Sequence, residues 1–249
     1  MTSAVAGGAP LLYVCVRPQS GAAEAEYRSF GEAMHAGAER LHAHDLVHQP
    51  LPDDVFDRFA GFVVGGSPFN VADPESTKTD VQRRLEADLE KIARQAASGR
   101  TSALFTCYGI GIVSRMLGAE VTRGFPEDTG PTTVELTEDG ERDALFGGLA
   151  HRFQALTAHK EGTGEAPPGA VLLARGEACP VQAYRVGSTL YATQFHPEPT
   201  AAAFIDRMAV YRNDGYFEAE RFDEVAARVR AASLTEPPRL LRAFAASLA

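Results

Sequence analysis

Three short and almost entirely apolar runs constrain the fold of this chain more than any other feature. They are LLYVCVRP at residues 11–18, FAGFVVGG at 59–66 and SALFTC at 102–107. Runs of this length without polar alternation are typical of strands buried on both faces, as in a parallel sheet. Stretches of helical composition lie between them, at 22–37 and 79–98. This alternation of strand and helix predicts an α/β fold.

The second half of the chain has a different pattern. From Thr132 onward, short strand-like runs are separated by glycine, proline and acidic turn residues, which predicts a β-rich second half. Residues 201–249 are mostly helical in composition. We therefore expect a single domain over residues 1–249, with a flexible leader at 1–10 and a helical C-terminal extension at 213–249.

Charge and cysteine content exclude several classes of protein. A net charge of −9 and a pI of about 5.3 argue against nucleic acid or an anionic membrane surface as partner. The three cysteines form no CxxC pair, which argues against a disulfide framework or a structural zinc site and favours a reducing, cytoplasmic location. Cys15 lies in the middle of a predicted strand and Cys179 precedes a proline, so both are expected to be structural.

Cys107 lies between a predicted strand and a predicted helix, in the segment ALFTCYGIGIV at 103–113. A helix N-terminus stabilises a thiolate, and the backbone N–H of Tyr108 would point toward an oxyanion formed at an attacked carbonyl group. Gly109 is the small residue that a tight nucleophile turn needs. The local sequence leaves a second interpretation open, in which Cys107 is a buried cysteine that packs as a small apolar residue.

A base and an orienting carboxylate for such a nucleophile occur together near the end of the run TLYATQFHPE. His196 and Glu198 are two residues apart, so in extended backbone they share one face. The imidazole would then reach Cys107 while the carboxylate accepts its other N–H. The alternative is an exposed histidine and glutamate that flank a turn at Pro197.

A glycine pair follows the second apolar run, in GGSPFNV. Gly65 and Gly66 have no Cβ atom, so the backbone there approaches a ligand closely. A backbone N–H of this loop is a candidate for the second oxyanion donor beside that of Tyr108. The alternative is an ordinary turn at the end of a strand.

Together these segments resemble the class I glutamine amidotransferases, the group with a catalytic triad. The family has a Gly-Gly-Pro type loop, a cysteine elbow and a late Q-F-H-P-E, and this chain looks closest to its free-standing, GMP-synthase-like members. The matching segments are GGSP at 65–68, TCYG at 106–109, AHKE at 158–161 and QFHPE at 194–198, and the resemblance runs from about residue 11 to residue 208.

The resemblance implies a flavodoxin-like three-layer α/β sandwich with a mostly parallel central sheet. It implies that Cys107 is the nucleophile, that His196 is general base and acid, and that Glu198 orients the histidine. It also implies that Gly66 and Tyr108 donate backbone N–H groups to an oxyanion hole. The remaining residues that it places around the substrate are Gly65, Ser67, Gly111 and His159.

Three positions depart from the family pattern. Gly111 stands where the family has a glutamine that holds the amino-acid end of the substrate, Ile110 replaces the usual histidine or methionine, and Phe105 replaces the first elbow glycine. None of these positions belongs to the triad. They bear on which substrate is accepted, more than on acyl transfer to Cys107.

The function implied by the resemblance is hydrolysis of the glutamine side-chain amide through a γ-glutamyl thioester. Because we find no GxxxxGK[ST] phosphate loop, the ammonia would pass to an acceptor synthase that binds in trans. Two alternatives remain open, a free-standing γ-glutamyl hydrolase acting on a γ-glutamyl-amine conjugate and a non-catalytic binding protein on the same fold. We expect a small-molecule substrate and no cofactor, metal, nucleic acid or membrane partner.

Overall fold

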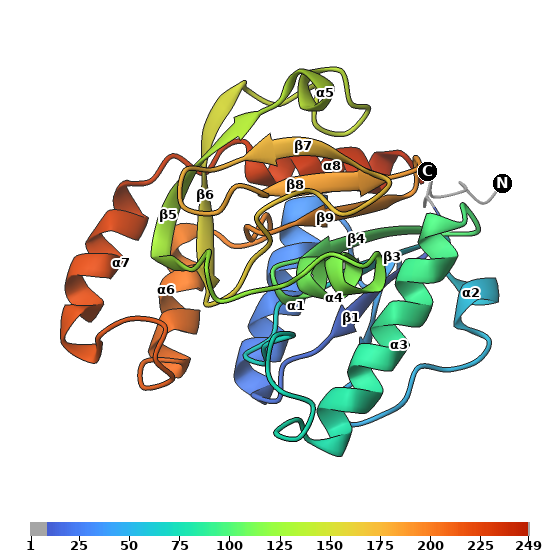
Figure 1. Ribbon diagram of the computed structural model, residues 1–249, viewed down its shortest axis with the longest axis horizontal. Coiled ribbons are helices and arrows are strands. Elements are labelled where there is room, and N and C mark those ends of the chain that lie inside the picture. Colours follow the sequence, from blue (N-terminus) through green and yellow to red (C-terminus); the bar gives the residue numbers. More distant parts are fainter. Residues whose placement is uncertain (1–8, 249) are drawn as a thin grey trace, which may run out of the picture.

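The computed structural model describes residues 9–248, so most of the expected leader lies outside the described residues. One sheet of nine strands runs through the protein in the order β2-β1-β3-β4-β9-β8-β7-β5-β6 (Figure 1). The strands are β1 (Leu11–Cys15), β2 (Leu41–Asp45), β3 (Gly61–Val64), β4 (Ser102–Thr106), β5 (Glu127–Leu136), β6 (Arg152–His159), β7 (Ala170–Arg175), β8 (Ala183–Val186) and β9 (Leu190–Thr193).

Helices cover both faces of the sheet and complete three layers. In Figure 1, α3 and α4 lie in front of the parallel strands, while α1 and α8 lie behind the sheet. The helices are α1 (Ser20–Met34), α2 (Val55–Arg58), α3 (Asp80–Ala97), α4 (Tyr108–Met116), α5 (Glu138–Glu141), α6 (Ala201–Val210), α7 (Phe222–Ala231) and α8 (Pro237–Ala246), with a short 3₁₀ turn, η1, at Ala219–Arg221.

The apolar runs read from the sequence are buried on both faces. In β1, Leu11 and Tyr13 belong to the core beneath α1 and α8, while Leu12 and Val14 belong to the core beneath α3 and α4. Successive residues of a strand point to opposite faces of the sheet. When helices cover both faces, the side chains on each face must therefore be apolar. The expected three-layer α/β fold is confirmed.

The sheet is mixed, and its two halves follow the change of pattern seen in the sequence. The pairs that join β2, β1, β3, β4 and β9 are parallel, whereas the pairs that join β9, β8, β7, β5 and β6 are antiparallel. β9 comes from the second half but pairs with β4 of the first half, with Thr193 opposite Thr106. This pairing places the segments after β4 and β9 next to each other, at the carboxyl ends of both strands.

Helices of the C-terminal part pack on both layers. Phe204 and Met208 of α6 and Val225 and Val229 of α7 form a small core with Leu156 of β6. α8 packs against α1 on the far face of the sheet. In the part of the chain that the structure describes, no helix is both long and apolar enough to cross a membrane.

Candidate active site

Cys107 occupies a strained turn between β4 and α4. Its backbone has φ 51° and ψ −107°, a region that costs a residue with a side chain about 1–3 kcal/mol. The turn is held because the Cys107 N–H donates to the carbonyl oxygen of Thr193 in β9 at 2.8 Å. A Cβ atom on Gly109 would stand 3.0 Å from the Phe105 side chain, so the expected small residue is needed here and Phe105 fills the space against it.

His196 is held beside Cys107 by one backbone and one side-chain contact. Its N–H donates to Leu156 O at 2.8 Å, and its Nδ1 lies 3.1 Å from Glu198 Oε1. Arg207 Nη1 lies 3.3 Å from the same Nδ1, but a guanidinium only donates, so the Nδ1 proton goes to Glu198. Burial alone lowers the pKa of a histidine, but Glu198 and Cys107 outweigh it and raise the pKa of His196 to about 9.

Glu198 belongs to a buried chain of alternating charges. Its Oε1 accepts from Arg207 Nη1 at 2.8 Å, and Arg207 Nη1 also lies 3.4 Å from Glu26 Oε1, which accepts from Arg17 Nη2 at 2.8 Å. Both carboxylate side chains are fully buried. Although burial raises the pKa of a carboxyl group, His196 and Arg207 hold the pKa of Glu198 well below its usual range. The Glu198 carboxylate is therefore ionised.

The glycine loop after β3 runs along this charge chain. The Gly66 N–H, which the resemblance assigns to an oxyanion hole, instead donates to Glu26 Oε1 at 3.3 Å. A Cβ atom on Gly66 would stand 2.7 Å from Arg17 Nη2 and 2.7 Å from His196 Cε1, so only glycine fits between these side chains. Ser67 is buried beside the cavity, and its hydroxyl donates to a backbone carbonyl group at 2.8 Å.

Two cavities meet at Cys107. We call the first the polar pocket; it is partly open to solvent, and a sphere the size of a water molecule can move within about 20 Å³ of it. The second, the histidine-side pocket, is also partly open, and the same sphere can move within about 40 Å³ of it. The lining of the polar pocket includes Ser67, Asn70, Tyr108, Gly111, His159 and Glu161, and that of the histidine-side pocket includes His196, Phe204, Met208, Tyr211, Tyr216 and Phe217, while Ser67, Cys107, Ala158 and Tyr216 line both.

The wall of the polar pocket explains the departure at Gly111. A Cβ atom there would stand 3.0 Å from Val71 Cγ2 and 3.6 Å from Glu161 Oε1. The Glu161 carboxylate accepts the backbone N–H groups of Val71 at 2.7 Å and Ala72 at 2.9 Å. The loop after β3 is thereby tied close to α4, and it fills space that a longer side chain at 111 would need.

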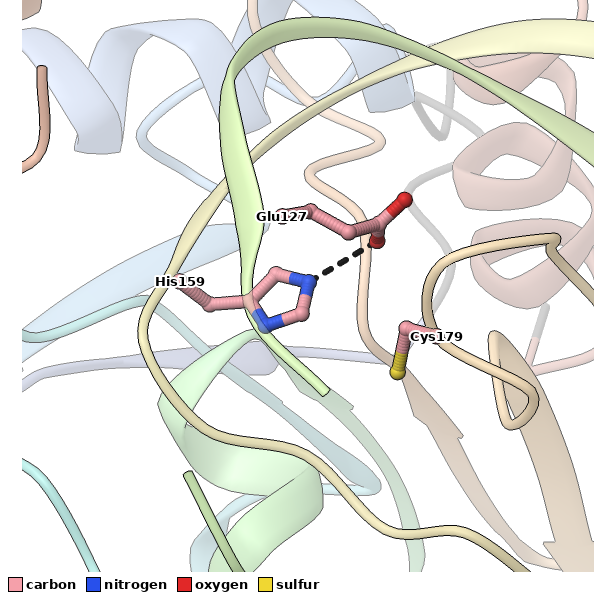
Figure 2. Close-up of side chains that lie close together, drawn as sticks. All are labelled: Glu127, His159 and Cys179. Carbon is pink, nitrogen blue, oxygen red and sulfur yellow. Dashed lines mark hydrogen bonds and ion pairs between the residues drawn. The ribbon is translucent and has the colours of Figure 1, made fainter. Parts of the chain in front are cut away.

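His159 lies at the end of β6 and is buried. Its Nδ1 lies 2.7 Å from Glu161 O and its Nε2 lies 2.8 Å from Glu127 Oε2, the contact drawn in Figure 2. Gln182 Nε2 donates to the same carboxylate oxygen at 2.6 Å. Cys179 lies close by (Figure 2), and burial raises the pKa of its thiol to about 12. These residues could approach a metal ion, but the histidine and carboxylate atoms are already used in hydrogen bonds.

Several residues of the site were not predicted from the sequence, among them Arg17, Glu26, Arg207 and Tyr216. Arg17 carries a signal that could have been used, because it is a charged residue at the end of an otherwise apolar strand run. Glu26 and Arg207 lie on helices, where charged residues are usually exposed. Tyr216 lies in an irregular segment between α6 and η1 and carries no local signal.

Comparison with known families decides the assignment. The model of the family described as glutamine amidotransferase class-I matches residues 33–209. The chain belongs to this family. The resemblance read from the sequence motifs is confirmed.

Two curated relatives show the range of similarity. One subunit of the glutamine-hydrolyzing GMP synthase of Thermococcus kodakarensis is 33% identical over 93 residues, 37% of this chain and 48% of that protein. The match thus spans about half the length of this relative. Gamma-glutamyl peptidase 3 of Arabidopsis thaliana is 25% identical over 204 residues, 79% of this chain and 76% of that protein.

Solved structures support the fold. The crystal structure of a glutamine amidotransferase from Thermotoga maritima superposes with a TM-score of 0.77, covering 97% of this chain and 98% of the other, at 16% identity. This likeness concerns the architecture alone.

Proposed function

We propose that this protein hydrolyses the side-chain amide of glutamine or of a γ-glutamyl amine, by way of a γ-glutamyl thioester on Cys107. The observation that carries the proposal is the joint placement of a strained cysteine at a helix N-terminus and a histidine whose far ring nitrogen is bonded to an ionised carboxylate. This arrangement matches the requirements of nucleophilic catalysis by cysteine.

The first half-reaction follows from which ring atom is free. Nδ1 of His196 faces Glu198, so Nε2 is the nitrogen that exchanges a proton with sulfur and substrate. The Cys107 thiolate attacks the γ-carbonyl carbon and forms a tetrahedral oxyanion. As the C–N bond breaks, the proton on Nε2 passes to the leaving nitrogen, and the γ-glutamyl group remains on sulfur as a thioester.

The second half-reaction uses the same groups. Water gives a proton to Nε2 and its oxygen attacks the thioester carbon. The C–S bond then breaks, which restores the thiolate and the imidazolium and releases glutamate. Water supplies the oxygen and the proton that the products gain, so no other reagent is consumed.

Two backbone N–H groups are proposed to stabilise the oxyanion. Tyr108 is the first residue of α4, and among the described residues its N–H has no backbone acceptor. The second is assigned to Ser67 in place of Gly66, since the Gly66 N–H is used by Glu26, whereas Ser67 lines both pockets at Cys107. Loss of one such donor costs about 3 kcal/mol of barrier.

Glutamine hydrolysis with ammonia delivered to a synthase in trans is one form of this function. It is supported by the similarity to subunits of glutamine-hydrolyzing GMP synthases. Hydrolysis of a γ-glutamyl amine is the second form, supported by the match to a γ-glutamyl peptidase over most of both chains. The free cysteines favour a cytoplasmic location for either form.

The test is glutamate release by the isolated protein from glutamine and from γ-glutamyl amines, compared with the variant Cys107→Ala. We expect release by the unaltered protein, none by the variant, and mass-spectrometric labelling of Cys107 by a glutamine-like electrophile. Cys15 and Cys179 serve as internal controls, because both are buried and neither lines either pocket. Equal glutamate release by the unaltered protein and by Cys107→Ala contradicts the proposal. So does the absence of release from every substrate, which would favour a non-catalytic binding protein.

A further inference from the structure

The position of the histidine-side pocket indicates which part of the substrate it would hold. The general acid must contact the leaving nitrogen, and His196 lines this pocket but not the polar pocket. The amine that departs therefore lies on this side of Cys107. The acyl portion lies on the other side, in the polar pocket with Gly111, His159 and Glu161.

The size of the histidine-side pocket exceeds what ammonia requires. A sphere the size of a water molecule can move within about 40 Å³ of it, whereas one molecule of that size needs about 10–15 Å³. The pocket therefore has room for an amine larger than ammonia, and it is open to solvent on one side, so such a group can extend outward. The pocket meets the polar pocket at Cys107, Ser67, Ala158 and Tyr216, so one substrate can occupy both with its amide carbon at the sulfur.

The chemistry of the walls indicates which amine fits. Phe204, Met208, Tyr211, Tyr216 and Phe217 contribute aromatic and thioether surface. Phe204 and Met208 also belong to the buried core formed by α6, α7 and β6. Such walls gain free energy from burying apolar surface and favour aromatic groups.

The charges near this pocket favour neither a cationic nor an anionic amine. Arg17 and Arg207 line it, but Glu26 and Glu198 pair with them, so two positive charges are matched by two negative charges. At the boundary with the polar pocket, the ammonium group of Lys160 lies over the Tyr216 ring, 4.4 Å from its centre, and would repel a second cation.

We propose that the histidine-side pocket is a leaving-group site, and that the preferred substrate is a γ-glutamyl amide whose amine carries an uncharged, aromatic or similarly bulky apolar group. This inference rests on the proposed amide hydrolysis. Of the two proposed forms of the function, it favours hydrolysis of a γ-glutamyl-amine conjugate over delivery of ammonia to a synthase.

The test compares γ-glutamyl phenethylamide with γ-glutamyl ethylamide and glutamine. Both amides release a primary alkylamine of similar basicity, so the ratio of their kcat/KM values reports the contact made by the phenyl ring. We expect a ratio of about ten or more in favour of the phenethylamide, as for other apolar groups that enter a fitting pocket. Inhibition of ethylamide hydrolysis by the phenethylamide gives the same order of preference from binding.

A variant locates the effect. Phe217→Ser removes part of the apolar wall and is expected to lower the ratio several-fold. Val210→Ser is the matched control, because Val210 is exposed at the end of α6, does not line the pocket and should leave the ratio unchanged. If Phe217→Ser does not fold, the ratio measured on the unaltered protein decides alone.

The outcomes separate the two proposals. A ratio near one or below one, or a high ratio that Phe217→Ser leaves unchanged, overturns the leaving-group site while amide hydrolysis stands. A preference for glutamine above both amides overturns it as well and favours ammonia delivery. If no substrate releases glutamate and Cys107 is not labelled, the proposed hydrolysis itself fails.

Discussion

Replacing Arg207 by methionine tests whether the buried charge chain stabilises the protein. The Arg207 side chain is only 6% exposed, and its Nη1 lies 2.8 Å from Glu198 Oε1 and 3.4 Å from Glu26 Oε1. Arg207→Met leaves two fully buried carboxylates, of which Glu26 keeps Arg17 as its cationic partner and Glu198 keeps only the His196 ring. Removing one partner of a buried ion pair costs about 3–5 kcal/mol, so we expect the free energy of unfolding to fall by that amount.

A second substitution distinguishes lost charge from lost packing. Glu26→Gln added to Arg207→Met removes one of the two carboxylates that Arg207 contacted, and with it the repulsion between Glu26 and Glu198 that Arg207 no longer offsets. The two substitutions should therefore be non-additive, with a favourable coupling of about 1 kcal/mol or more. If the loss came from packing alone, the double variant would show the sum of the two single losses.

Urea unfolding at pH 7.5, followed by circular dichroism and extrapolated linearly, measures these free energies. Arg142→Met is the control, because Arg142 is 68% exposed and its ion pairs with Glu138 and Asp139 lie at the surface. It should change stability by no more than about 0.5 kcal/mol. A cost below about 1 kcal/mol for Arg207→Met, or strict additivity with Glu26→Gln, refutes the reasoning.

Three further predictions concern the site and its surroundings. Gly66→Ala forces the His196 ring to move, so kcat/KM for glutamate release should fall about 100-fold. Gly21→Ala is the control and should leave kcat/KM unchanged, because a Cβ atom there meets nothing within 4 Å. Equal activities of the two variants would contradict the role assigned to His196. The alkaline limb of a kcat/KM profile against pH should lie at about 9, where His196 loses its proton, and a limb near 6.5 would show that its pKa is not raised. The pKa of Glu127 is lowered, since hydrogen bonds outweigh its burial, so its contribution to stability is present above pH 4.5 and lost as pH falls through its folded pKa. The urea midpoint of Glu127→Gln should therefore fall less steeply with decreasing pH than that of the unaltered protein. Parallel curves for the two proteins would show that Glu127 does not contribute to stability in this way.

The layers of the fold could be predicted because they follow from patterns within short stretches of the sequence. The apolar runs at β1, β3 and β4 are readable without any partner, and Thr79 marks the start of α3 by accepting the N–H of Gln82 at 3.1 Å. The order of the strands could not be predicted in the same way. The insertion of β9 beside β4 is a pairing of distant segments, and no residue near either strand specifies it.

The same distinction between local patterns and distant contacts applies to the candidate site. Cys107, His196 and Glu198 could be proposed from the sequence because each lies in a short motif that resembles a known family. Glu26 and Arg207 were missed because a buried charge on a helix looks like a solvent-exposed one until its partner is known. The assignment of Gly66 shows the limit of the resemblance, since the motif gives the loop but not the direction of each N–H.

The position of β9 has a consequence for how the chain is made. On the ribosome, β1 to β4 emerge long before Leu190–Thr193, and until then β4 has one unpaired edge of backbone N–H and C=O groups. Such an edge invites pairing with other chains. The nascent protein is therefore most prone to aggregate in this interval, and a chain released before residue 193 would carry both this open edge and an incomplete site.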